Sequence, residues 1–68
     1  MIKLPKDIYG LDVIKSGLSA FSDLGEFELL EEEKYYHIKV RNSRYDPIIT
    51  LREFENYLLD LINAKGIL

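Results

Sequence analysis

Residues 35–41 read YYHIKVR, and this stretch decides the fold. Apolar and polar side chains alternate along it with a period of two, which is typical of a β-strand with one buried face. Tyr36, Ile38 and Val40 would then face the core. The opposite face would carry a basic and aromatic row, namely Tyr35, His37, Lys39 and Arg41. This row is either a binding surface or a solvated face whose charge a neighbouring strand balances.

The segment before this strand predicts its hairpin partner. Phe27 and Leu29 alternate with glutamates, and a polar run over residues 31–34 separates the two strands. A turn centred between Glu32 and Glu33 would put apolar residues on one face and opposite charges across the other. The cross-strand pairs would be Phe27–Ile38, Leu29–Tyr36, Glu26–Lys39, Glu28–His37 and Leu30–Tyr35. Two glutamates suit a tight type I′ turn poorly, so we expect a four-residue loop in the same register.

A short strand and a helix precede this hairpin. Residues 2–5 alternate apolar and polar side chains before a proline, which predicts a first strand that ends at this proline. The helical stripe that follows consists of Leu11, Ile14, Leu18 and Phe21, widened by Val13, Ala20 and Leu24. We expect Gly25 to end this helix. Gly17 would weaken the helix or mark a close approach to the sheet.

A second helix is expected near the carboxyl end. Residues 42–49 are expected to form a loop, after which Thr50 and Glu53 have the spacing of a capping box. The apolar stripe of this helix consists of Leu51, Phe54, Leu58 and Leu61, supported by Tyr57 and Ile62. Gly66 would end the helix and leave residues 67–68 as an apolar tail.

The predicted fold is a single α+β domain over residues 1–68, with the element order β-α-β-β-α. Two helices would pack on one face of a three-stranded, mostly antiparallel sheet. A parallel first strand would require a right-handed crossover, but we favour its antiparallel pairing with the third strand. A chain of 68 residues without cysteine has only its small core to stabilise it, so self-association is a serious alternative to a monomer.

Charge and hydropathy exclude some classes of protein. The net charge of −3 argues against nucleic acid as a partner, and no apolar run is long enough for a membrane span. The amino terminus lacks the apolar stretch of a signal peptide, so a cytoplasmic location is the default.

Catalytic and metal-binding patterns are not apparent in the sequence. His37 is the only histidine, and a metal site without cysteine would need it together with carboxylates such as Glu28. The glutamates at 31–33 lack the interleaved Asp, Asn and Gly of a calcium loop. The serines lack a second histidine and a nucleophile elbow. We therefore expect no enzymatic activity, no catalytic residue, no metal ligand and no cofactor, and interpret His37 as a surface histidine paired with a glutamate.

The basic and aromatic row is the best candidate for a functional site. The candidate binding residues are Leu30, Tyr35, His37, Lys39, Arg41 and Arg44. A nucleic-acid surface would combine exposed aromatic rings with lysine and arginine, but Glu26 and Glu28 alongside would repel phosphate. We therefore favour a protein or peptide partner, with a homo-oligomer or weak nucleic-acid binding as alternatives. An extended peptide could also add to a free sheet edge, unless charge protects that edge.

Several segments are similar to those of a known family. They are Tyr9 at the entry to the first helix, Ala20–Asp23 at its end, the glutamate-rich hairpin and Phe54–Asp60 in the last helix. On these residues, and over most of its length, the chain resembles the HxsD-like small proteins of His-Xaa-Ser peptide maturation systems. The resemblance implies an accessory role beside radical-SAM maturases and their peptide substrates. Since no catalytic residues are assigned in this family, the implied function is binding.

Overall fold

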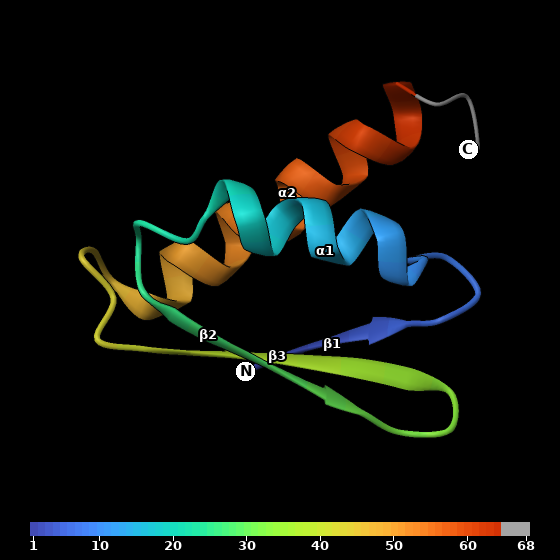
Figure 1. Cartoon of the computed structure of the whole chain (residues 1–68), viewed down its shortest axis with the longest axis horizontal. Helices are drawn as coiled ribbons and strands as arrows, with labels where there is room; N and C mark the ends of the chain where they lie inside the picture. The colour runs from blue at the N-terminus through green and yellow to red at the C-terminus, as the bar shows by residue number, and fades with distance from the viewer. Residues whose placement is uncertain (65–68) are drawn as a thin grey trace.

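The computed structural model of the protein describes residues 1–64, which form a sheet layer and a helix layer (Figure 1). The elements are β1 (Ile2–Pro5), α1 (Leu11–Ala20), β2 (Glu26–Glu31), β3 (Tyr35–Arg41) and α2 (Pro47–Ala64). The strands form an antiparallel sheet in the order β1-β3-β2. Both helices lie on the same side of it, which confirms the predicted α+β fold and the pairing of β1 with β3. The helix end predicted at Gly66 and the apolar tail at 67–68 lie outside the described residues.

The core lies between the sheet and the two helices. Its largest fully buried side chains are Leu4, Ile14, Ile38, Phe54, Leu58 and Ile62. The buried stripe of α2 ends at Ile62, whereas Leu61, which was predicted to line it, is only half-buried. Leu11, predicted to begin the stripe of α1, is exposed at the first position of that helix. The apolar periodicity thus gave the correct helices and the correct side of each, with errors at the margins of the stripes.

Gly17 marks a close approach of α1 to α2, and the predicted approach to the sheet is wrong. A Cβ atom built on Gly17 would lie 2.6 Å from Cδ2 of Leu58 and 3.1 Å from Cε2 of Phe54. Both of these α2 side chains have no exposed surface. The absence of a side chain at this position therefore sets how closely the two helices pack.

The first helix ends five residues before Gly25, so the predicted stop at that glycine is wrong. Phe21 closes the helix, and the amide of Leu24 donates to the carbonyl of Phe21 at 2.9 Å in the turn that follows. The Phe21 ring packs edge-on against Phe54 with a centroid distance of 5.4 Å. This aromatic contact holds the turn on the core while the chain leaves the helix to enter β2.

The second helix begins at Pro47, so the capping box predicted at Thr50 is wrong, and the predicted loop is confirmed only over residues 42–46. Oδ1 of Asp46 accepts hydrogen bonds from the amides of Ile48, at 2.9 Å, and Ile49, at 3.2 Å. This is N-cap geometry, and the proline that follows suits the first helical position because its missing N–H would have no partner there. Thr50 is buried inside the first turn.

The β2–β3 hairpin has a register two residues away from the predicted one. Its pairs are Glu26–Arg41, Phe27–Val40, Glu28–Lys39, Leu29–Ile38, Leu30–His37 and Glu31–Tyr36. A shift of two residues keeps every side chain on its predicted face, because faces alternate with period two. The shift arises because β2 continues to Glu31 and only residues 32–34 separate the strands, in place of the expected four-residue loop. The amide of Glu32 donates to the carbonyl of Tyr35 at 2.8 Å and closes the turn.

Candidate functional site

The side of the sheet opposite the helices is the open face. It is formed by Lys3, Pro5, Glu26, Glu28, Leu30, Tyr35, His37, Lys39 and Arg41. The structure thus brings together all but one of the predicted binding residues. Arg44 instead lies in the connection between β3 and α2, where its amide donates to the carbonyl of Leu24 at 2.9 Å. Lys3 and Pro5 were missed, because only the pairing of β1 with β3 brings them to this face.

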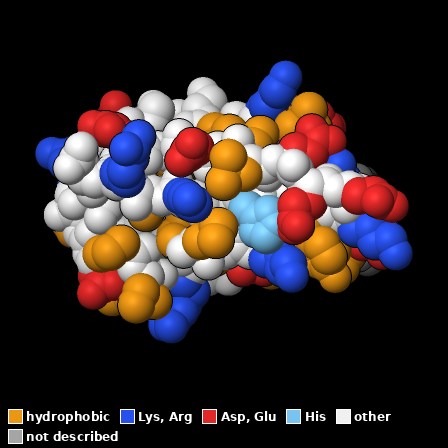
Figure 2. Space-filling model, turned by 90° about the horizontal axis from the view of Figure 1, so that it is seen from below, with side chains coloured by type: hydrophobic (Ala, Val, Ile, Leu, Met, Phe, Trp, Pro, Cys, Tyr) orange, Lys and Arg blue, Asp and Glu red, His pale blue; other side chains and the backbone are white. Residues whose placement is uncertain are grey.

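His37 lies near the middle of the open face, where Figure 2 shows apolar side chains and a carboxylate beside it. Its Nε2 atom is hydrogen-bonded to Oε1 of Glu32. This hydrogen bond, together with the charges of His37 and Lys3, holds the pKa of the Glu32 carboxyl below its usual value. The interpretation of His37 as a surface histidine paired with a glutamate is therefore confirmed. The partner is Glu32 because the observed register places Glu28 opposite Lys39.

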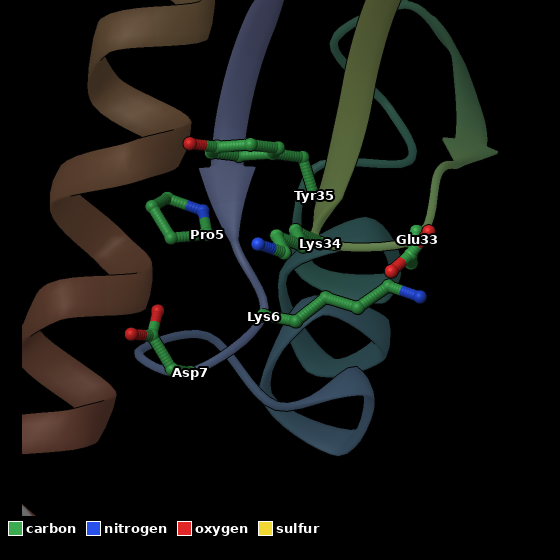
Figure 3. A pocket seen from close by; sticks show the side chains of 6 residues that line it. All are labelled: Pro5, Lys6, Asp7, Glu33, Lys34 and Tyr35. Carbon is green, nitrogen blue, oxygen red and sulfur yellow. The ribbon is translucent and has the colours of Figure 1, made fainter.

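Tyr35 is already in contact with a cation on the neighbouring strand. Nζ of Lys3 lies over its ring, 4.5 Å from the centroid, in a cation–π arrangement. Pro5 is the direct cross-strand neighbour of Tyr35, and Figure 3 shows the tyrosine side chain reaching across β1 beside it. One face of the ring is thus occupied, which reduces what Tyr35 offers to a nucleobase for stacking.

Leu30 is the apolar feature of the open face. It is 39% exposed and lies directly opposite His37, whose side chain is only 16% exposed. An accessible aliphatic group therefore borders a largely packed imidazole ring. Such a pair can be buried by a partner at little cost in charge desolvation, unlike the lysines and glutamates around it.

The charges of the open face balance. Its cations are Lys3, Lys39 and Arg41, and its carboxylates are Glu26 and Glu28 together with Glu32 at the turn. Glu26 lies opposite Arg41 and accepts a hydrogen bond from Nδ2 of Asn42 at 2.9 Å. A face with three charges of each sign attracts phosphate weakly, because each cation has a carboxylate nearby.

A hollow of about 420 Å³ lies at the hairpin end of the molecule (Figure 3). It is lined by Pro5, Lys6, Asp7, Glu33, Lys34 and Tyr35. Nζ of Lys6 lies 2.5 Å from Oε2 of Glu31 and 4.9 Å from the centroid of the Tyr36 ring, so this cation is already engaged. With two lysines and two acids in its lining, the hollow does not favour a ligand of either charge.

Within residues 1–64, no group of three or more histidine, cysteine, aspartate or glutamate side chains is arranged to hold a metal ion. Neither helix in the described part of the chain has the length and apolar character needed to cross a membrane.

Comparison with known proteins provides no assignment for this site. No protein-family model matches the chain, and no curated protein or solved structure is significantly similar to it. The resemblance to the HxsD-like proteins therefore stays a prediction.

Proposed function

We propose that the protein is a non-catalytic binding module that holds a protein or peptide partner on the open face of its sheet. The observation that carries the proposal is the exposed side chain of Leu30 beside the packed ring of His37, on the side of the sheet opposite both helices. Protein interfaces commonly place such apolar or aromatic groups at their centre and charged groups at their rim. The balanced charges around Leu30 suit that rim.

The hydrogen bonding and the burial of His37 support a binding role over a catalytic one. Its Nε2 atom is engaged with Glu32, and its ring is largely covered by neighbouring side chains. The resemblance to accessory proteins of peptide maturation makes a radical-SAM maturase, or the peptide that it modifies, the first partner to test.

The test is a nuclear magnetic resonance titration of the isotope-labelled chain, with a purified maturase of this type and with a His-Xaa-Ser peptide in separate experiments. We expect amide shift changes to concentrate on β3 and on Leu30. A Leu30→Glu variant should bind at least roughly tenfold more weakly, since a charge would enter the centre of the contact. The matched control is Leu11→Glu, because Leu11 is a leucine of nearly the same exposure, 37% against 39% for Leu30, but lies on α1. Shifts confined to the helices, or undiminished binding by Leu30→Glu, would contradict the proposal.

Self-association is a second candidate function, favoured by exposed apolar side chains elsewhere on the surface. Tyr45, just before α2, is 65% exposed, and Ile48 and Ile49, in the first turn of this helix, are 69% and 52% exposed. A small core gains from covering such side chains in a dimer. Sedimentation at micromolar concentration distinguishes the two functions: a folded monomer eliminates self-association, whereas a dimer that Ile48→Glu dissociates supports it.

A further inference from the structure

The two edges of the sheet differ in how much main chain they leave unpaired. β1 and β2 are the edge strands. β1 has four residues and ends in Pro5, which has no N–H to offer. The Pro5 carbonyl already accepts hydrogen bonds from the amides of Ile8, at 3.2 Å, and Tyr9, at 3.0 Å. Proline and the tight turn after it thus protect the β1 edge against a further strand.

The β2 edge is open, and its hydrogen-bonding groups follow from the ladder. The bond from the amide of Glu32 to the carbonyl of Tyr35 makes these two residues a hydrogen-bonded pair. Such pairs alternate along an antiparallel ladder, so Glu28 and Leu30 also direct their main-chain groups toward β3. The intervening β2 residues direct theirs away from β3, toward the free edge. They are Phe27, Leu29 and Glu31.

The other ladder of the sheet supports this assignment. The amide of Lys6 donates to the carbonyl of Lys34 at 2.9 Å, so the even-numbered residues of β3 bond toward β1. Its odd-numbered residues must then bond toward β2, as the hairpin requires. Within residues 1–64, no turn, loop, cap or side-chain hydrogen bond engages the main-chain groups of Phe27, Leu29 and Glu31. Three donors and three acceptors therefore line one edge.

The side chains along this edge indicate the chemistry of an added strand. On the open face it would lie beside Glu26, Glu28 and Leu30, and on the helix side beside Phe27 and Leu29. The two helix-side residues are half-buried and pack at the margin of the core, so an apolar neighbour would complete their burial. β2 contains acidic residues and no basic one.

We propose that the β2 edge binds an extended peptide segment by strand addition, and that this segment alternates basic and apolar residues. Its basic side chains lie beside Glu26 and Glu28, and its apolar side chains extend the core beside Phe27 and Leu29. This inference rests on the proposal that the protein is a binding module, but assigns the contact to the edge of the sheet. A second copy of β2 is a poorer occupant, because it would bring more glutamates to the same edge without any base.

The probe is a capped synthetic peptide of alternating lysine and valine, of about the length of β2. A peptide of alternating glutamate and valine is its control. Two further forms of the probe carry backbone N-methyl groups, one on all valines and the other on all lysines. In an antiparallel added strand, the residues whose side chains point to the helix side also donate their N–H groups to β2. Methylated valines should therefore weaken binding roughly tenfold or more, whereas methylated lysines should have little effect.

Two measurements on the protein complete the test. Amide hydrogen exchange should slow at Phe27, Leu29 and Glu31 when the lysine-valine peptide binds. Glu28→Lys should lower the affinity for the lysine-valine peptide and raise the affinity for the glutamate-valine control. Glu53→Lys, which changes an exposed glutamate on α2, should change neither affinity. The edge inference is overturned if the unmethylated probe does not bind at millimolar concentration, or if both methylated forms bind equally well. The open-face proposal has a separate outcome. If Leu30→Glu weakens the binding of a maturase or a His-Xaa-Ser peptide, that proposal stands even when the edge inference fails.

Discussion

Adding a single methyl group at Gly17 tests how the two helices are held over one side of the sheet. In a Gly17→Ala variant the new carbon would lie 2.6 Å from Cδ2 of Leu58, and 3.1 Å and 3.2 Å from Cε2 and Cζ of Phe54. Carbon atoms in contact normally lie about 3.5–4.0 Å apart, so the closest of these approaches is too short by roughly 1 Å. Leu58 and Phe54 are fully buried and have no solvent-filled space to move into.

Two opposing terms set the size of the effect. Alanine is favoured over glycine in a helix by about 1 kcal/mol. Overpacking a buried contact costs about 1–3 kcal/mol, because side chains leave their rotamers or the helices move apart. We therefore expect a net loss of about 1 kcal/mol in the free energy of unfolding. Ser19→Ala, at an exposed position of the same helix, has no such contact and should change the stability by less than about 0.5 kcal/mol.

The assay is urea denaturation followed by far-ultraviolet circular dichroism, with the slope of the transition checked for constancy. A Leu58→Val variant removes the clashing Cδ2 atom and should cost about 1 kcal/mol by itself. Combined with Gly17→Ala it should destabilise the protein by less than the sum of the two single changes, because the closest of the three contacts is then absent. Additive effects, or a Gly17→Ala variant more stable than the unmodified chain, would refute the close packing of α1 against α2.

Two hydrogen-bonded pairs give pH-dependent predictions. Burial, followed by the hydrogen bond to Oε2 of Glu55 at 2.9 Å and the charge of Glu55, raises the pKa of Tyr9 from 10.0 to about 12. Between pH 10 and pH 12 this tyrosine ionises more readily in the unfolded chain than in the folded one, so the free energy of unfolding falls as the pH rises through this range. Urea denaturation should show the unmodified chain losing on the order of 2–3 kcal/mol relative to Tyr9→Phe over that range. A constant difference between the two proteins would contradict the pairing of Tyr9 with Glu55. In a His37→Ala variant, which has no side-chain donor, carboxyl-detected magnetic resonance should find the pKa of Glu32 closer to its usual value, because the hydrogen bond that lowers this pKa most is lost. An unchanged pKa would assign the shift to other groups.

The element types and faces could be predicted from the sequence because they depend on local periodicity. Alternation in YYHIKVR places Tyr36 and Ile38 in the core whichever partner the strand has, and the structure buries both. The hairpin register could not be predicted in the same way, since a slip of two residues leaves every face unchanged. The main-chain bond between Glu32 and Tyr35 selects the register, and side-chain patterns do not report on it.

The start of α2 shows a different ambiguity. Asp46 followed by Pro47 signals a turn, but the same pair suits an N-cap and a first helical residue equally well. Thr50 and Glu53 offered a second start with the spacing of a capping box. Tertiary packing decides between them, because it buries Thr50 within the helix and leaves Asp46 exposed to cap it.

The candidate site was predictable as far as β3 remains regular. Alternation correctly predicts which face of the sheet each side chain of residues 35–41 occupies. Asn42 adopts a positive φ of 51° where the strand ends, so the position of Arg44 cannot be extrapolated from the strand. Lys3 and Glu32 reach the site through strand order and register, which are long-range properties. Sequence alone therefore predicted the row on one strand, while its neighbours on the other strands required the structure.

The register also determines how the two proposed surfaces differ. It places Arg41 opposite Glu26 and Lys39 opposite Glu28, so a partner on the open face meets balanced charge and must gain most of its affinity from apolar contact around Leu30. A basic strand at the β2 edge approaches the same glutamates from the side away from those cations. Salt screens interactions between exposed charges, with a Debye length of about 8 Å at physiological ionic strength. Binding at the edge should therefore weaken as salt is added, whereas binding on the open face should change little, because a balanced face has little net attraction to lose.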